Sequence, residues 1–263
     1  MRVNEYYFAK SVEDAFDKLH ENPKNSLIAG GLWMKKTAQS YETLIDLSRL
    51  GLDKIEDKGS EIHVGALTTL RAFEESPLIN SLNSGATAFG VREIMGVQFR
   101  NMATIGGSVF GRYPFSDVIA SLLVLDVKLH FYPEAILTLE EYLSYKGKYD
   151  GILTHIIIKK EESKGYFKKV KTTALDFPLV NISISHRNKK FYIAVGSRPM
   201  LASLCHKAMD YMNSLSSIEE EDFKKAAEIA ASELTFADSN NISKQYREDL
   251  TRVYVRRGLK EVY

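Results

Sequence analysis

The sequence predicts an α+β protein in which a mixed first part is followed by an antiparallel sheet and three helices. Two observations support this class. In the first part, short apolar strands alternate with amphipathic helices and glycine-containing turns. From about Ile152 onward, strand patterns follow one another through Lys- and Asn-rich turns, and three helical patterns then close the chain. We therefore place a domain boundary near residue 155, which gives domains over 1–155 and 156–263.

In the first part, a helix is predicted after Ser11, a good N-cap, because Val12, Ala15, Phe16 and Leu19 recur at helical spacing. A short buried strand over 26–29 runs directly into Gly30-Gly31. Val127, Leu129 and Phe131 alternate as a strand should. The remaining elements expected here are strands over 44–47 and 62–66, and helices over 70–75 (capped by Thr68 or Thr69), 78–86, 118–123 and 140–142 (capped by Thr138).

In the second part, four runs of residues are predicted to be strands of one antiparallel sheet, and three longer runs have helical periodicity. The strands are 152–158, 166–173, 179–185 and 191–195. The helices are 200–215, 218–234 and 243–259.

Composition excludes several classes of function. The chain has 263 residues, of which 44% are hydrophobic and 26% charged, and its net charge is +1. Such a balance favours neither nucleic acid nor an anionic membrane as a partner. One cysteine allows neither an intrachain disulfide nor a four-cysteine cluster site. Residues 1–16 lack the apolar run of a signal peptide, and the run 118–125 is too short to cross a bilayer, so a cytoplasmic location is expected.

The stretch 98–108 contains the most suggestive chemistry. A glycine pair, Gly106-Gly107, lies between the hydroxyl side chains of Thr104 and Ser108. Glycine lets backbone N–H groups approach a ligand, and successive donors beside hydroxyls suit phosphate oxygens. Downstream, Ser116 and Asp117 form a turn that can cap a helix beginning near Val118. A plain glycine turn between two strands is the alternative interpretation.

Other catalytic and binding signatures are missing. Lys35 stands where a P-loop needs its second glycine, and the glycines at 106, 107 and 111 do not form the dinucleotide fingerprint. The six histidines lie far apart in the sequence and never at metal-ligand spacing, so no metal site is expected. Neither a nucleophile motif nor an acid–base pair is visible, so no catalytic side chain is predicted. A protein with glycine turns as its only convincing site is expected to hold a cofactor that does the chemistry.

An ordered set of motifs extends over nearly the whole chain. These are Ala29-Gly30-Gly31, the run 64–70, the stretch Gln98–Asn101 with Thr104–Gly107, Ser116-Asp117, and the C-terminal run 243–247 with Arg256-Arg257. Together they resemble the FAD-binding subunit of the molybdenum hydroxylases, the xanthine dehydrogenase and carbon monoxide dehydrogenase family. The resemblance implies an FAD-binding domain of the PCMH (vanillyl-alcohol-oxidase-like) type, with two lobes of about 1–55 and 56–155, followed by a C-terminal domain.

The resemblance also implies the site. Two glycine loops would straddle the FAD diphosphate, Asp117 would hydrogen-bond the ribose or adenine side, and three further positions would contact the flavin. The first loop consists of Leu27, Ile28, Ala29, Gly30, Gly31, Leu32, Trp33 and Met34, the second of Thr104, Ile105, Gly106, Gly107 and Ser108, and the flavin contacts are Ile94, Leu153 and Lys168. Lys168 has an alternative interpretation as one charge of a basic strand.

Two departures from the family pattern affect this site. Leu32 and Trp33 replace a hydroxyl and a second polar residue, so only backbone donors remain for the phosphates in the first loop. Trp33 packs either on the cofactor or in a core or interface. Ser108 replaces an asparagine but keeps a donor.

By resemblance, this chain is an electron-transfer subunit that works with a large molybdopterin subunit and a small subunit carrying two 2Fe–2S clusters. Electrons would pass through FAD to NAD+ or another acceptor. Two alternatives remain: a flavin-poor structural subunit of such a complex, and a stand-alone flavin oxidase of the same fold superfamily.

Overall fold

The computed structural model describes residues 1–239 and 241–263, which form two compact units. Each unit is assembled from three segments of the chain. The first unit comprises Met1–Phe73, Gly96–Gly111 and Val127–Ile158, and the second comprises Glu74–Met95, Arg112–Asp126 and Lys159–Tyr263.

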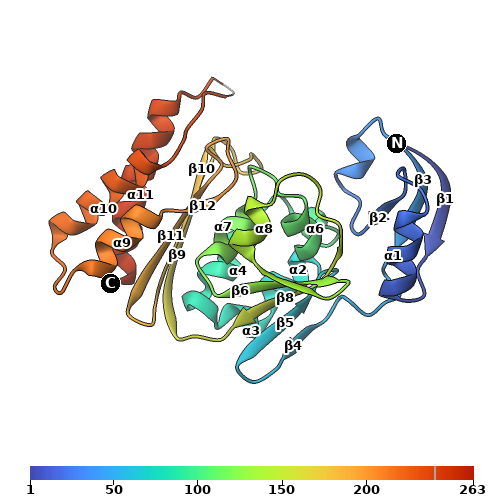
Figure 1. The fold of residues 1–263 in the computed structure, drawn as a ribbon. Coiled ribbons are helices and arrows are strands. Elements are labelled where there is room, and N and C mark those ends of the chain that lie inside the picture. The colour runs from blue at the N-terminus through green and yellow to red at the C-terminus, as the bar shows by residue number, and fades with distance from the viewer. Residues whose placement is uncertain (240) are drawn as a thin grey trace. The chain divides into compact units, whose positions relative to one another are not determined.

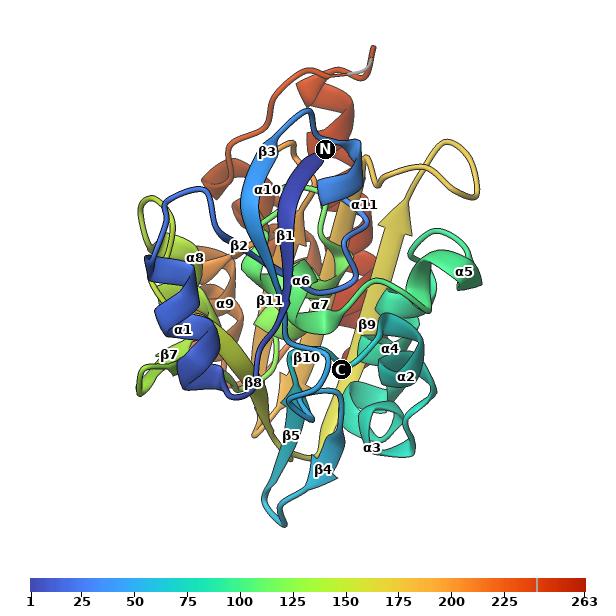
Figure 2. The same cartoon turned by 90° about the vertical axis from the view of Figure 1, so that its right-hand side faces the viewer.

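The first unit begins with a small parallel sheet. Its strands are β1 (Arg2–Phe8), β2 (Ser26–Ile28) and β3 (Ser40–Asp46), in the order β1-β3-β2. Figure 2 shows β1 and β3 side by side at the start of the chain. Helix α1 (Val12–His20) connects β1 to β2 and begins as predicted, because the hydroxyl of Ser11 accepts a hydrogen bond from the N–H of Asp14.

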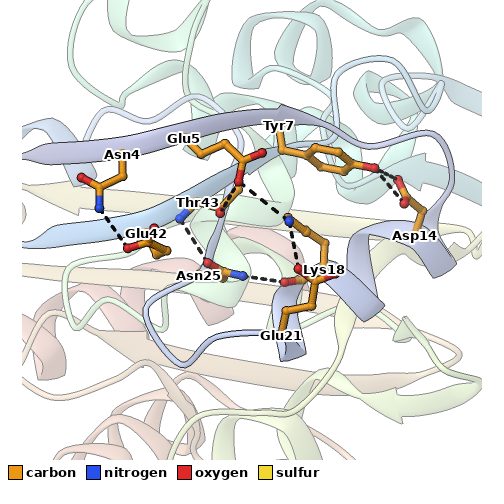
Figure 3. A network of polar contacts seen from close by, with 9 residues as sticks. All are labelled: Asn4, Glu5, Tyr7, Asp14, Lys18, Glu21, Asn25, Glu42 and Thr43. Carbon is orange, nitrogen blue, oxygen red and sulfur yellow. Dashed lines mark hydrogen bonds and ion pairs between the residues drawn. The ribbon is translucent and has the colours of Figure 1, made fainter.

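Polar contacts tie this sheet to α1 (Figure 3). The hydroxyl of Tyr7 on β1 donates to Asp14 on α1 at 2.9 Å, and the hydroxyl of Thr43 on β3 donates to Glu5 on β1 at 2.9 Å. The amide of Asn25 donates to the carbonyl of Lys18 and accepts from the N–H of Thr43. Asn25 therefore holds the turn before β2, the strand that leads into the first glycine loop.

A five-stranded sheet forms the rest of the first unit. Its strands are β4 (Ile55–Asp57), β5 (Glu61–Gly65), β6 (Val127–Tyr132), β7 (Ala135–Thr138) and β8 (Ile152–Lys159), in the order β4-β5-β8-β6-β7. The short helices of this unit are η1 (Met34–Lys36), α5 (Val97–Arg100), α6 (Ile105–Phe110) and α8 (Leu139–Ser144), and α2 (Leu70–Glu75) leads out of its first segment. Helix α8 starts with a capping box between Thr138 and Glu141, so Thr138 is the N-cap that the sequence predicts.

The second unit contains an antiparallel sheet, β9 (Ser163–Val170), β10 (Val180–Arg187), β11 (Lys190–Gly196) and β12 (Ser203–Leu204), in the order β12-β11-β10-β9. Three helices cover one face of it (Figure 1): α9 (His206–Ser214), α10 (Glu220–Glu233) and α11 (Lys244–Val262). Helices α4 (Ala86–Arg92) and α7 (Asp117–Leu123) contact the sheet from other segments of the unit. Side chains of β10 alternate between a core shared with α9–α11, which contains Ile182 and Ile184, and residues such as Asn181 that contact α7.

Two sequence predictions are wrong. Strand 152–158 does not join the sheet of the second part, because β8 lies between β5 and β6 in the five-stranded sheet. The helix predicted over 78–86 is broken into α3 (Pro77–Asn80) and the 3-10 turn η2 (Leu82–Gly85), because Asn83 and Ser84 adopt left-handed backbone angles. Strands β1, β4, β7 and β12 were not expected. In the part of the chain that the structure describes, none of the helices combines the length and apolar character needed to cross a membrane.

Candidate cofactor site

The first glycine loop begins within β2, to which Leu27 and Ile28 belong, and then lies against the chain that precedes α6. A Cβ atom added to Gly30 would lie 1.9 Å from the carbonyl oxygen of Met102, so only glycine allows this approach of the two backbones. Gly31 has φ +66°, a conformation that side chains disfavour. The loop then turns into η1, where the N–H of Lys35 donates to the carbonyl of Gly31 at 3.2 Å.

The backbone donors of this loop are available to a ligand. Within residues 1–239 and 241–263, no hydrogen bond joins the N–H groups of residues 29–32 to another protein group. These residues are half-buried or exposed. Consecutive N–H groups beside glycines that carry no Cβ make a concavity suited to phosphate oxygens. The first loop therefore suits a diphosphate through its backbone N–H groups alone. Leu32 and Trp33 supply no hydroxyl or amide side chain that could add to these donors.

The second glycine loop differs from the expectation, because its donors are used within the protein. The N–H of Ile105 donates to the carbonyl of Thr68, and that of Gly106 to the carbonyl of Ala66, both at 2.9 Å. The N–H of Gly107 donates to the hydroxyl of Thr104, which caps α6. A phosphate contact from these N–H groups would have to compete with their protein partners.

The glycines of the second loop have different surroundings. A Cβ on Gly106 would lie 2.5 Å from the carbonyl oxygen of Ala66, whereas one on the exposed Gly107 would meet only the Thr104 hydroxyl, at 2.9 Å. Gly106 is therefore required by packing, and Gly107 far less so. The hydroxyl of Ser108 donates to the Thr104 carbonyl at 2.9 Å. The cofactor contacts of Thr104, Ile105, Gly106, Gly107 and Ser108 stay predictions.

Trp33 packs against an aromatic side chain of the same unit. Its ring meets that of Phe99 on α5 edge-on, with centroids 6.2 Å apart, and the ammonium group of Lys36 lies 5.1 Å from the indole centre. Trp33 is half-buried, so part of the indole remains accessible. The pair fixes the first loop against α5, close to the Gly30–Met102 contact.

In the second unit, Asp117 is buried in an ion pair. Its carboxylate accepts hydrogen bonds from the ammonium group of Lys169 at 2.8 Å and from the amide of Asn181 at 2.7 Å. Burial raises the pKa of the Asp117 carboxyl above its ordinary value, and the attraction of Lys169 opposes that rise. The predicted helix cap is Ser116, whose hydroxyl accepts from the N–H of Ile119, and Asp117 is the first residue of α7.

Lys169 is the functional candidate that the sequence did not single out. Neighbouring residues of β9 point to opposite faces. Lys168, the predicted flavin contact, lies 5.4 Å from the ring of Tyr254 on α11, whereas Lys169 reaches Asp117 and also donates to the carbonyl of Glu93 at 3.1 Å. The sequence does contain a signal for Lys169. It lies two residues after the buried Phe167, and residues i and i+2 of a strand share a face.

Two further predicted positions lie in different units. Ile94 follows Glu93 directly in the second unit, and its N–H donates to the carbonyl of Val91 at 3.0 Å. Leu153 is buried on β8 in the first unit. Their flavin contacts stay predictions.

Two other kinds of site are relevant to the described residues: a metal site with three or more protein ligands, and a reactive thiol. Among the described residues, no group of three or more His, Cys, Asp or Glu side chains could hold one metal ion together. Cys205 is buried, and burial strongly raises the pKa of its thiol, which disfavours the reactive thiolate. Three histidines that are remote in sequence, His63, His130 and His155, do lie in one row on the five-stranded sheet.

Two family models together match almost the entire chain. Residues 2–159 match the model of the FAD binding domain in molybdopterin dehydrogenase, and residues 165–262 match the CO dehydrogenase flavoprotein C-terminal domain.

Curated relatives match at similar length. The nicotine 6-hydroxylase medium subunit of Paenarthrobacter nicotinovorans is 26% identical and covers 97% of this chain and 96% of its own length. The glyceraldehyde dehydrogenase medium chain of Sulfolobus acidocaldarius is 24% identical, with 98% and 97% covered.

Solved structures share the fold. A chain of carbon monoxide dehydrogenase from Hydrogenophaga pseudoflava superposes with a TM-score of 0.91 at 20% identity, covering 100% of this chain and 97% of its own. Quinoline 2-oxidoreductase from Pseudomonas putida 86 gives a TM-score of 0.87 at 18% identity, with 98% and 96% covered. The predicted fold class, an FAD-binding domain followed by a C-terminal domain of sheet and helices, is confirmed.

Proposed function

The chain belongs to the family of FAD-binding medium subunits of molybdenum hydroxylases, and we propose that it passes electrons from the iron–sulfur clusters of a partner subunit to NAD+ or another acceptor. Bound FAD supplies the redox chemistry, and the protein supplies binding and orientation. The proposed partners are a large molybdopterin subunit and a small subunit with two 2Fe–2S clusters. The cytoplasmic location expected from the sequence is part of this proposal.

One observation carries the FAD assignment: the N–H groups of residues 29–32 have no protein partner in the described part of the chain. These groups would bind the diphosphate oxygens. Gly30 allows the loop to approach Met102, and Gly31 supplies the left-handed backbone that the turn needs. Trp33 and Phe99 hold the loop in place.

The remaining predicted contacts have separate tasks in this proposal. Asp117 would hydrogen-bond the ribose or adenine side of FAD, and Ile94, Leu153 and Lys168 would contact the flavin. Lys169 positions the Asp117 carboxylate through their ion pair at 2.8 Å.

In this proposal the chain transfers electrons, and another subunit hydroxylates the substrate. We expect no acid–base pair or nucleophile to act beside residues 29–32, so hydroxylation of the substrate belongs to the molybdenum subunit. The chain alone should therefore exchange electrons with NADH or a dye when it holds FAD, and should hydroxylate nothing.

Purification of the chain alone, followed by reconstitution with FAD, tests the proposal. We expect flavin absorbance at one FAD per chain, diaphorase activity with a dye, and no hydroxylation of purines, other N-heterocycles or aldehydes. Robust hydroxylation by the lone chain would instead identify a stand-alone flavin oxidase. Co-purification of the two partner chains checks the assembly.

A flavin-poor structural subunit is the second candidate, and Leu32 and Trp33 favour it because they remove two polar side chains from the first loop. A chain that assembles with its partners, yet holds no flavin after reconstitution, would establish this role and overturn the electron-transfer proposal.

A further inference from the structure

Three imidazole side chains lie in a row on one face of the five-stranded sheet. His63 is on β5, His155 on β8 and His130 on β6, and these strands are adjacent in that order. The ring centroids of His63 and His155 are 6.4 Å apart, and those of His155 and His130 are 6.3 Å apart. All three side chains are partly exposed, whereas sequence neighbours such as Ile62 and Leu129 are fully buried on the opposite face.

The hydroxyl of Thr154 contacts His130 at two atoms, the backbone carbonyl oxygen and Nδ1 of the ring. The hydroxyl of Thr154 donates its only hydrogen to the carbonyl of His130 at 3.0 Å. In that arrangement the ring donates the contact of 2.8 Å between Nδ1 of His130 and the same hydroxyl oxygen. Nδ1 therefore holds the proton, and Nε2, at the outer end of the ring, keeps its lone pair.

The ring of His155 can also supply a lone pair to a metal ion, because its nitrogens are not used by the protein. Neither of its ring nitrogens has a hydrogen-bond partner among residues 1–239 and 241–263. His130 and His155 lie directly opposite each other in the β6–β8 pair.

His63 is less suitable as a ligand. Its Nε2 faces the carboxylate of Glu61 at 3.3 Å, and a carboxylate can only accept, so the lone pair lies on Nδ1. Nδ1 is bonded to Cγ, the ring atom that carries Cβ, and it therefore lies closer to the strand than Nε2 does. Its cross-strand partner Glu56 is paired with Lys58 at 3.2 Å.

We propose that His130 and His155 form a two-histidine site for a late divalent transition ion such as Zn²⁺, with water completing the coordination. Imidazole is a preferred ligand of Zn²⁺, Cu²⁺ and Ni²⁺, and the Thr154 contact orients one ring as outer hydrogen bonds do in metal sites. Two imidazoles that share an ion through bonds of about 2.0–2.1 Å have ring centres about 5–6 Å apart, so the observed spacing closes by small side-chain rotations.

Titration of tag-free, metal-stripped full-length protein with Zn²⁺ in a calorimeter tests this site. We expect one ion per chain, and a loss of affinity of about 10-fold or more in both His130→Gln and His155→Gln. The Cu²⁺ form should show two coordinated imidazole nitrogens by pulsed electron paramagnetic resonance. Circular dichroism of each variant establishes that the protein is folded.

Two matched variants complete the test. His63→Gln should keep the affinity, since its ring is not a ligand. His20→Gln should also keep it, because both ring nitrogens of His20 already contact Phe16 and Asp150. Absence of Zn²⁺ binding, or binding that survives His155→Gln in folded protein, overturns the proposal. Loss on His63→Gln with retention on His130→Gln overturns the stated ligand pair. None of these readouts depends on flavin.

Discussion

The backbone of Gly30 approaches the carbonyl oxygen of Met102 so closely that a methyl group on residue 30 would lie 1.9 Å from it. This contact holds the first glycine loop against the segment that leads into α6. Both segments belong to the first unit, although strands β3, β4 and β5 lie between them along the chain. The loop with open backbone donors is thus positioned by a close backbone contact that only glycine, which has no side chain, can make.

We predict that Gly30→Ala destabilises the first unit and reduces flavin content together. The added carbon has to displace backbone, and such overpacking costs about 1–3 kcal/mol. Urea denaturation measures the first effect, and flavin absorbance per chain after reconstitution measures the second.

Gly107→Ala is the matched control, since its methyl group meets only the Thr104 hydroxyl at 2.9 Å. It should lose less stability than Gly30→Ala. A Gly30→Ala protein with unchanged stability and full flavin content would contradict the assignment.

The ion pair between Lys169 and Asp117 should be a strong stability determinant of the second unit. Lys169→Met leaves a buried carboxylate without its cation, and breaking a buried pair in this way costs about 3–5 kcal/mol. Lys168→Met should cost about 1 kcal/mol or less, because that side chain only lies over Tyr254. Chemical denaturation of the two variants separates the neighbouring lysines, and equal losses would contradict the assignment.

The variant Asp117→Asn distinguishes two roles of this residue: stabilising the fold through Lys169, and contacting FAD. If Asp117 accepts a hydrogen bond from FAD, the affinity of the folded variant for FAD should fall by about 1–3 kcal/mol. If it serves only the pair with Lys169, unfolding becomes easier while the affinity for FAD stays unchanged. Fluorescence titration with FAD under fully native conditions distinguishes the two.

Trp33 is the only tryptophan, so its emission reports on the first loop alone. We predict that FAD binding quenches this emission and saturates at one FAD per chain, because the indole lies next to the loop that would hold the diphosphate. Phe99→Leu removes the ring that contacts Trp33 and should shift the emission of the FAD-free protein. Flavin that binds with no change in emission would place it away from this loop.

The contact between Tyr7 and Asp14 (Figure 3) gives a pH prediction. The backbone N–H of Lys10 and then the Tyr7 hydroxyl lower the pKa of Asp14 below its ordinary value of 3.8. A lowered carboxyl pKa means that the stabilisation is present above the ordinary pKa and is lost as the pH falls through the folded pKa.

Asp14→Asn should therefore flatten the acid side of a plot of thermal midpoint against pH. The neighbouring Asp17→Asn, on the same helix, is the control and should keep the slope of the unmodified protein. An acid slope that is unchanged in Asp14→Asn would contradict the role of this contact.

The parts of the fold that depend on local chemistry could be predicted from the sequence. Ser11 and Thr138 cap the helices that they were expected to cap, and β6 has the alternation of an amphipathic strand. Exposed or short edge strands such as β1 and β4 lack a clear pattern. Their pairing depends on partners far along the chain, which periodicity does not reveal.

Long-range pairing also explains the larger errors. Nothing in 152–158 tells which sheet the strand joins, because an apolar run suits either one. The kink at Asn83 and Ser84 interrupts a run with good helical spacing, and only the left-handed backbone reveals it. Likewise, His63, His130 and His155 become neighbours only because β8 lies between β5 and β6.

Residue type locates both glycine loops in the sequence, but it does not show how their N–H groups are hydrogen-bonded. Both glycine pairs were identified from residue type. Whether their N–H groups were open to a ligand depended on Thr68 and Ala66, whose carbonyls occupy the donors of the second loop. Lys169 was missed for a similar reason, since a run of lysines in β9 gives no direct sign of which one is buried.

The order of strands in the five-stranded sheet has a consequence for biosynthesis. Strand β8, which lies at the centre, is the last of the five to leave the ribosome. Until it emerges, β5 and β6 each expose an unpaired edge, and such edges invite association with other chains. A nascent chain stalled before Ile152 should therefore depend on chaperones, whereas one that has passed Lys159 can close the sheet.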